Sequence, residues 1–165
     1  MKLWAKLLIA AVAILLIIQI PIFQPDKNYS EADPVDDIAA KYNSLFMDDM
    51  DIYMDFQNAC YDCHSNYTED YPWYYAIQPV SWWMDHHIKK AKDSLNFSEF
   101  ANYTPQEAAY KLKLIHDVME DHSMPLKSYL WMHDEAKLDD DHYRDVAEWA
   151  KKTRQKVLDE LDSIE

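Results

Sequence analysis

Apolar residues recur at helical spacing along most of the chain beyond residue 35. The clearest case begins at residue 105, where Ala108, Leu112, Ile115 and Met119 fall on one helical face. Similar apolar stripes occupy residues 36–48, 52–64, 82–93 and 139 to near the C-terminus. No stretch alternates apolar and polar residues as a half-buried strand does. The pattern therefore predicts an all-α domain of about five helices.

Helix starts and turns can be placed from single residues. Thr104, Pro105 and Glu107 form a capping box with proline at the first helical position. Ser81 is expected to cap the helix that begins at Trp82. The chain contains no glycine, which argues against a hairpin-rich β fold, and Asn, Asp and Pro are expected to make the turns. Loops are expected at residues 65–80 and 95–103.

The N-terminal segment has a different pattern. Residues 7–18 are an unbroken apolar run, which continues less strictly to Phe23. As a helix this run would be ~25 Å long, slightly short of a ~30 Å hydrocarbon core. A cleaved signal would need small residues after the run, and bulky ones stand there. We expect residues 1–24 to be an uncleaved transmembrane anchor, with a removed signal segment as the alternative.

The remaining chain divides into a linker and one domain. Residues 25–35 are mostly polar and contain Pro25 and Pro34, which is typical of a linker. Residues 36–165 form the domain. Lys2 and Lys6 precede the apolar run and acids follow it, which predicts a cytoplasmic N-terminus and a domain outside the cytoplasm.

The chain is strongly acidic, with 16 Lys and Arg against 30 Asp and Glu and a formal net charge of −14. Such a surface repels nucleic acid and attracts basic proteins. The acids can equally serve only to keep the domain soluble. We expect no nucleic-acid partner, and a protein partner with a basic docking face.

Cys60, Cys63 and His64 form a C-x-x-C-H motif, and these are the only two cysteines. On a helix the three positions share one face, so both thiols and the imidazole point the same way. The arrangement suits a haem c held by two thioether bonds, with His64 as proximal iron ligand. A thioredoxin-like pair would need a βαβ context, and a zinc site would need a second ligand pair.

The second axial position of the iron decides function. Met124 lies in a polar stretch and precedes Pro125, and a methionine opposite a histidine is typical of electron transfer. Its alternative role is ordinary core packing. His122, His133 and His87 are rival ligands, and an open position would admit oxygen, peroxide or nitric oxide. Lys89, Lys90, Lys92 and Arg144 are candidate partners of the haem propionates.

Several stretches together carry a family resemblance: residues 60–66, 71–74, 79–83, 87–88, 95–98, Met124-Pro125 and, more loosely, 133–138. With them the chain resembles the small bacterial haem-binding domain family, which is related in outline to monohaem c-type cytochromes. The resemblance implies covalent haem at Cys60 and Cys63, with His64 as proximal ligand. It also implies that Met124 with Pro125 matches the Met-Pro pair that supplies the distal ligand in cytochromes c.

We therefore expect a membrane-anchored c-type haem protein that faces the bacterial periplasm from the inner membrane and carries single electrons to a redox partner. A haem-based gas or peroxide sensor, or a small peroxidase with an open or labile distal site, is the alternative. A third hypothesis is a thiol-disulfide oxidoreductase that uses Cys60 and Cys63.

Overall fold

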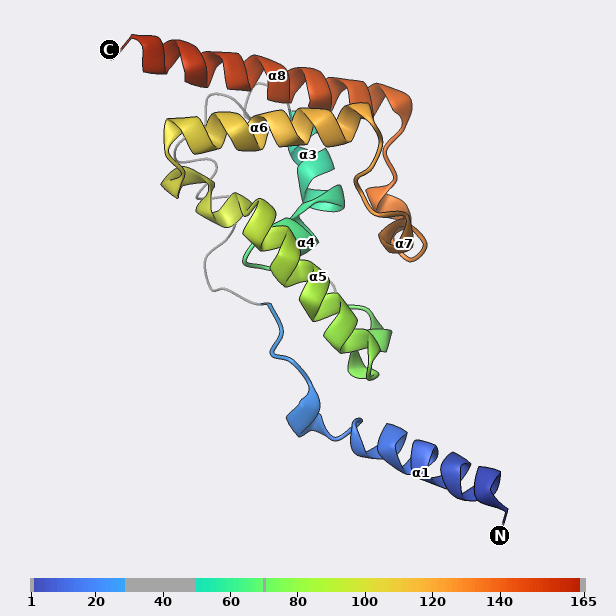
Figure 1. Cartoon of the computed structure of the whole chain (residues 1–165). Coiled ribbons are helices and arrows are strands. Elements are labelled where there is room, and N and C mark those ends of the chain that lie inside the picture. Colours follow the sequence, from blue (N-terminus) through green and yellow to red (C-terminus); the bar gives the residue numbers. More distant parts are fainter. Residues whose placement is uncertain (1, 29–49, 70, 164–165) are drawn as a thin grey trace.

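The computed structural model describes residues 2–28, 50–69 and 71–163, and all regular structure within them is helical (Figure 1). The all-α prediction is confirmed. The helix expected at residues 36–48 lies outside the described residues. In chain order the elements are α1 (Leu3–Ile17), η1 (Pro21–Phe23), α3 (Met50–Ala59), α4 (Tyr61–His64), η2 (Trp73–Ala76), α5 (Val80–Ser94), η3 (Phe97–Asn102), α6 (Pro105–Glu120), α7 (Lys127–Leu130), η4 (Asp134–Ala136) and α8 (Asp140–Asp162).

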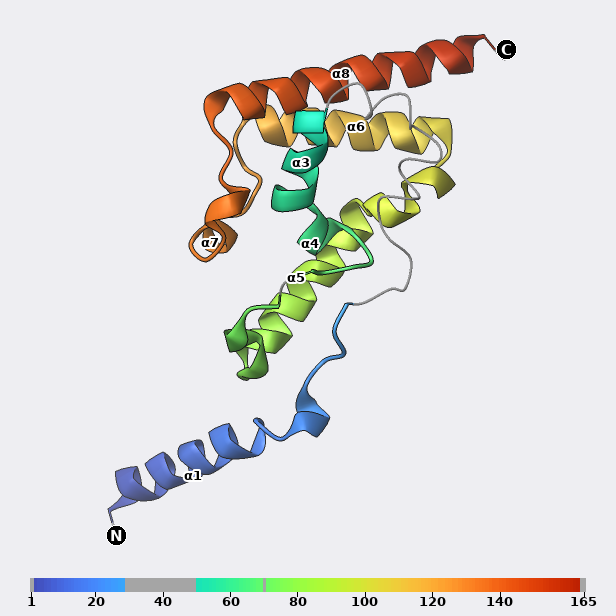
Figure 2. The ribbon, with the colours of Figure 1, turned by 180° about the vertical axis from the view of Figure 1, so that it is seen from behind.

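The main core lies where α6 and α8 pack side by side, running in opposite directions (Figures 1 and 2). Leu112 of α6 and Ala150 of α8 are fully buried between them. Phe56 of α3 belongs to the same core. Its ring contacts Trp149 of α8 and Phe97 of η3 at centroid distances of 5.1 Å each. Burial of this apolar surface is the main force that holds the four elements together.

The capping box that begins α6 is confirmed. The Glu107 backbone N–H donates to Thr104 Oγ1 at 3.3 Å, and the Thr104 N–H donates to Glu107 Oε2 at 2.9 Å. The expectation for Ser81 is wrong: α5 begins at Val80 after Pro79, and Ser81 is buried in the first turn. The expected loop at residues 95–103 contains the 3-10 helix η3, whose N-cap Asn96 accepts a hydrogen bond from the Ser98 N–H.

The turn at the C-terminus of α6 is of a kind that usually contains glycine, which this chain lacks. His122 has φ 53°, the left-handed conformation that glycine usually takes after a helix. The His122 N–H donates to the Met119 carbonyl at 3.3 Å, and the Ser123 N–H donates to the Val118 carbonyl at 3.1 Å. These two bonds form a Schellman motif. A histidine therefore makes the turn that Asn, Asp or Pro was expected to make.

The N-terminal apolar segment is shorter as a helix than predicted. α1 has 15 residues, and Ile18 is its C-cap. Pro21 then begins the separate turn η1, since proline lacks the N–H that a continuing helix needs. Among the residues described, no helix combines enough length with enough apolar character to cross a membrane. The transmembrane helix expected within residues 1–24 is corrected to this short apolar helix.

A hydrogen bond between α3 and α8 involves two titratable groups. Asp55 is 8 % exposed, and its Oδ1 lies 2.7 Å from His142 Nδ1. Burial raises the pKa of Asp55 above its usual range. The hydrogen bond to Asp55 raises the pKa of His142. Both groups hold protons more tightly in the folded chain than in the unfolded one, so folding weakens as the pH rises.

Replacing His142 with glutamine tests this pair. The imidazolium contribution is complete below the unfolded pKa of about 6.5 and is lost as the pH rises through the raised folded value. The free energy of unfolding should therefore fall by up to about 1 kcal/mol between about pH 6 and pH 8, since His142 is partly exposed. In His142→Gln that slope should be smaller, as measured by urea unfolding.

His116 provides the matched control, because its Nδ1 lies 3.2 Å from the Ala147 carbonyl and also joins α6 to α8. His116→Gln should keep the slope of the unmodified protein. An identical slope in His142→Gln and the unmodified protein would contradict the linkage.

Candidate haem-binding site

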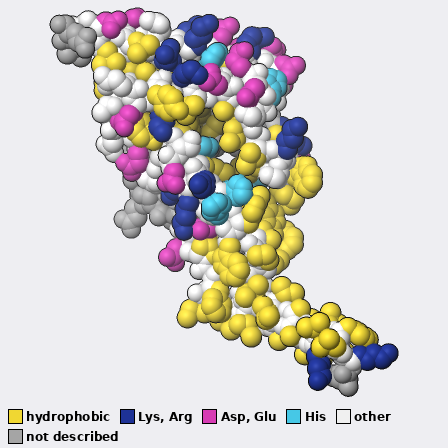
Figure 3. Space-filling view, in the orientation of Figure 1, with side chains coloured by type: hydrophobic (Ala, Val, Ile, Leu, Met, Phe, Trp, Pro, Cys, Tyr) yellow, Lys and Arg dark blue, Asp and Glu magenta, His cyan; other side chains and the backbone are white. Residues whose placement is uncertain are grey.

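An apolar cavity of about 400 Å³ lies between the C-terminal part of α3, α4, α5, α6 and the segment that follows α6. In the space-filling view, a hollow among hydrophobic side chains is visible in the upper part of the molecule (Figure 3). Its volume is within the range of small-molecule and cofactor sites. The residues predicted from the motif and the resemblance all line it: Cys60, Cys63, His64 and Met124.

The two cysteines stand on a tight turn in the cavity wall. α3 ends at Ala59, and the Cys60 carbonyl accepts hydrogen bonds from the N–H groups of Cys63 at 3.2 Å and His64 at 2.9 Å. The continuous helix expected through residue 60 is interrupted there, because Cys60 has φ −126° and is the N-cap of the separate helix α4. The motif residues Cys60, Cys63 and His64 nevertheless all line the same cavity. Both cysteines are free, and burial raises the pKa of each thiol to about 12. The thiols are therefore neutral at neutral pH.

His64 is held in the form that can bind a metal. Its Nδ1 lies 3.0 Å from the Leu95 carbonyl, which can only accept, so Nδ1 carries the proton and Nε2 keeps its lone pair. Burial lowers the pKa of His64, which favours the neutral imidazole. The ring also lies edge-on to Phe97, at a centroid distance of 6.4 Å. One backbone carbonyl thus fixes both tautomer and ring orientation.

A polar cluster holds the segment after the motif against η3. The Asn66 N–H donates to Ser98 Oγ at 3.0 Å, and Asn96 Nδ2 donates to Asn66 Oδ1 at 2.9 Å. The Ser98 N–H donates to Asn96 Oδ1 at 3.1 Å. Two of the stretches that carried the resemblance, residues 60–66 and 95–98, are therefore direct neighbours. Packed together, they bring the Leu95 carbonyl within hydrogen-bonding distance of His64 Nδ1.

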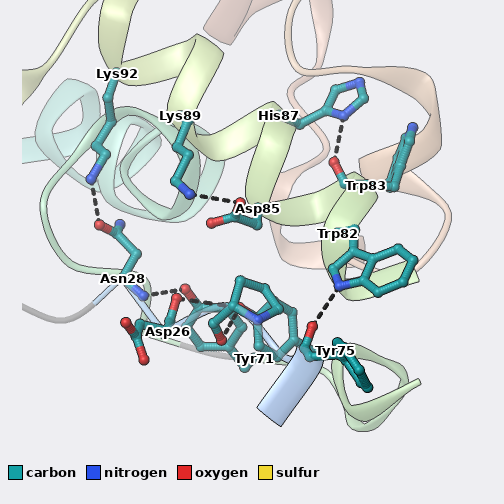
Figure 4. A network of polar contacts seen from close by, with 12 residues as sticks. Asp26, Asn28, Tyr71, Tyr75, Trp82, Trp83, Asp85, His87, Lys89 and Lys92 are labelled. Carbon is teal, nitrogen blue, oxygen red and sulfur yellow. Dashed lines mark hydrogen bonds and ion pairs between the residues drawn. The ribbon is translucent and has the colours of Figure 1, made fainter. Parts of the chain in front are cut away.

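Met124 and His87 are the two candidate distal ligands that reach the cavity. Met124 follows the Schellman turn of α6 and is partly buried against the core, with Pro125 buried beside it. His87 comes from α5, and its Nδ1 lies 2.8 Å from the Trp83 carbonyl (Figure 4). Because a carbonyl can only accept a hydrogen bond, Nδ1 carries the ring proton and donates it to this bond. The lone pair of His87 Nε2 can therefore bind a metal.

The other two rival histidines do not line this cavity. His122 is exposed and stacks on Tyr143 at a centroid distance of 4.0 Å. His133 is buried, stacks on Tyr129 at 4.0 Å, and places Nδ1 3.0 Å from Glu135 Oε1. It borders a smaller adjacent cavity of about 80 Å³.

Tyr129 and Asp62 are site residues that the sequence reasoning missed. Tyr129 borders both cavities, and its hydroxyl donates to Asp62 Oδ2 at 3.0 Å. Burial, with the nearby Asp62 carboxylate, raises the pKa of Tyr129, so its hydroxyl stays protonated. Asp62 lies between the two cysteines, and its position inside the motif was a signal. Nothing in the sequence singled out Tyr129.

One lysine stands apart among the candidate cations. Lys89 pairs with Asp85 at 2.8 Å, and Lys92 donates to Asn28 at 2.6 Å (Figure 4). Arg144 pairs with Asp141 at 2.8 Å. Lys90 alone of the four borders the cavity. Its ammonium is therefore the one of these cations positioned to meet an anionic group of a bound molecule.

These features are typical of proteins that bind a porphyrin. A C-x-x-C-H turn with an oriented neutral imidazole on an apolar cavity suits a porphyrin that carries iron. Within the described residues, no cluster of three or more His, Cys, Asp or Glu could hold a metal ion by itself.

The comparison with family models agrees. The model of a family described as "Haem-binding domain" matches residues 13–152, and the chain belongs to this family. No curated protein matches the chain, and no solved structure does either.

Phe97 is the side chain that joins the cavity wall to the core. It is 2 % exposed and contacts Phe56, Tyr61 and Phe100. Phe97→Ala should lower the free energy of unfolding by about 3–5 kcal/mol, because it leaves a void where three elements meet. Urea unfolding measures this loss. Tyr110→Ala, at an exposed position of α6, should change stability by less than about 0.5 kcal/mol. A loss below about 1 kcal/mol for Phe97→Ala would contradict this role.

Proposed function

We propose that this chain is a c-type haem protein that carries single electrons. In this proposal Cys60 and Cys63 would hold the haem covalently, and His64 and Met124 would bind its iron. The observation that carries it is the convergence of these four side chains on one apolar cavity of about 400 Å³. The family match supports haem as the occupant.

Each residue has a defined task in this function. When bound, the haem iron supplies the one-electron chemistry. The cysteines prevent loss of the group, and the Leu95 carbonyl keeps the His64 lone pair aimed into the cavity. The apolar wall limits the access of water, and a thioether ligand at Met124 raises the reduction potential relative to a second nitrogen ligand. Lys90 would pair with a carboxylate of the bound group.

The surroundings of the protein are part of the proposal. A net charge of −14 would attract a basic redox partner and speed its encounter at low salt. Outside the cytoplasm two cysteines at this spacing would become a disulfide unless haem consumed them. Because Lys2 and Lys6 precede the apolar run and acids follow it, we place the domain outside the cytoplasm, facing the periplasm in a bacterium. The exposed apolar helix α1 would attach it to the membrane.

The distal ligand is tested with two matched variants, Met124→Ala and His87→Ala, in protein matured with haem. Optical and near-infrared absorption are recorded for each. The oxidised protein should show a weak near-infrared sulfur-to-iron band that Met124→Ala abolishes and His87→Ala leaves intact. The Met124 variant should also have a lower reduction potential.

The opposite result has a clear meaning, because both side chains border the cavity. Loss of the low-spin spectrum in His87→Ala alone would assign the position to His87 and overturn Met124. A high-spin spectrum that neither substitution changes would show an open position, which favours gas or peroxide chemistry over electron transfer.

A further inference from the structure

The two longest uncharged stretches of this acidic chain lie in different parts of the sequence. They are residues 7–25 and residues 71–84, in a sequence of which 28 % is charged. The first comprises most of α1 together with η1, and the second comprises η2 and the start of α5. Neither the haem site nor the core accounts for the second stretch, since several of its large side chains face outward.

Hydrogen bonds join the two uncharged stretches. Gln19 Nε2 donates to the Gln78 carbonyl at 3.0 Å, and the Gln78 N–H donates to Gln19 Oε1 at 2.9 Å. Gln24 Nε2 donates to the Ala76 carbonyl at 2.9 Å, and Trp82 Nε1 donates to the Phe23 carbonyl at 2.6 Å (Figure 4). The segment that follows α1, residues 19–24, is therefore fixed to the end of the domain from which α5 starts.

We call the outward side chains of that end the aromatic tip, formed by Trp73, Ile77, Trp82 and Trp83. Their exposed fractions are 75 %, 42 %, 40 % and 51 %. Hydrophobic side chains run without a break from α1 over the lower end of α5 (Figure 3). Burial of such a patch stabilises any complex that covers it, and exposed apolar patches usually mark interaction surfaces.

The chemistry of the surface selects a lipid bilayer as the cover. α1 has no buried residue and is apolar on all sides, whereas a protein partner would need only one apolar face. Tryptophan favours the membrane–water interface, where its ring is in apolar surroundings and its N–H reaches a polar group. Acidic side chains would oppose contact with an anionic lipid surface, and the aromatic tip has none.

We propose that the aromatic tip lies in the headgroup region of the membrane beside α1. The domain is then held at two places and keeps one orientation, with α6 and α8 at its far end from α1 (Figures 1 and 2). The inference rests on the proposed membrane attachment and adds a second contact to it. It also assigns Trp73 and Ile77, which border neither cavity, a role apart from haem.

Lipid photolabelling tests the proposal on the full haem-loaded chain. The protein is reconstituted into phosphatidylcholine vesicles that contain a phosphatidylcholine with a diazirine near its headgroup, and labelled peptides are identified by mass spectrometry after illumination. Label is expected on the peptide that contains residues 71–84 and on the peptide of α1. The peptide that contains Tyr110, an exposed aromatic residue of α6, should carry none.

Two variants sharpen the result. Trp73→Ser combined with Ile77→Ser should reduce label on residues 71–84 by about tenfold, since two large apolar side chains leave the lipid. Tyr110→Ser should leave the labelling unchanged. The optical spectrum of each variant should match that of the unmodified protein, which shows that the haem site is intact.

The outcomes separate the two contacts. Label on the α1 peptide without label on residues 71–84 would overturn the aromatic tip and leave membrane attachment in place. Label on neither would overturn both. Equal label on residues 71–84 in the unmodified protein and in the Trp73 and Ile77 double variant would also overturn the role of the tip.

Discussion

The hydrogen bond from His64 Nδ1 to the Leu95 carbonyl is the contact on which the site depends. It sets the tautomer and the direction of the one imidazole that the C-x-x-C-H turn supplies, while burial lowers the pKa of His64 and so favours the neutral ring. That carbonyl is in place only when η3 packs against α4. Hydrogen bonds among Asn66, Asn96 and Ser98 hold these two segments together. Phe97 then extends the same segment into the core beneath α6 and α8. Ligand orientation and domain stability are therefore properties of one packed unit.

A second constraint is the absence of glycine. The turn after α6 needs one residue in the left-handed conformation. His122 takes this conformation, and its ring stacks on Tyr143 of α8. This turn delivers Met124 and Pro125 to the cavity directly after the helix ends. The stacked ring of His122 does not line the cavity that Met124 and His87 border. The same residue thus shapes the loop that carries Met124.

Local signals in the sequence predicted much of this structure. The capping box of Thr104 and Glu107, the stripe from Ala108 to Met119 and the spacing of Cys60, Cys63 and His64 depend on neighbours close in sequence. The missed features depend on contacts between distant residues: Tyr129 reaches Asp62, and Asp55 meets His142. Ser81 was misplaced as a cap because Pro79 starts the helix earlier. The N-terminal helix was overextended because the apolar pattern continues to Phe23, whereas α1 ends at Ile17 and Pro21 begins a separate turn.

Covalent attachment of haem is the central claim, and intact mass spectrometry under denaturing conditions tests it most directly. Protein produced with haem-attachment machinery should retain the mass of one haem after unfolding. Cys60→Ser combined with Cys63→Ser should have the mass of the bare chain. A bare mass for the unmodified protein, with both thiols still reactive toward a maleimide, would contradict the account.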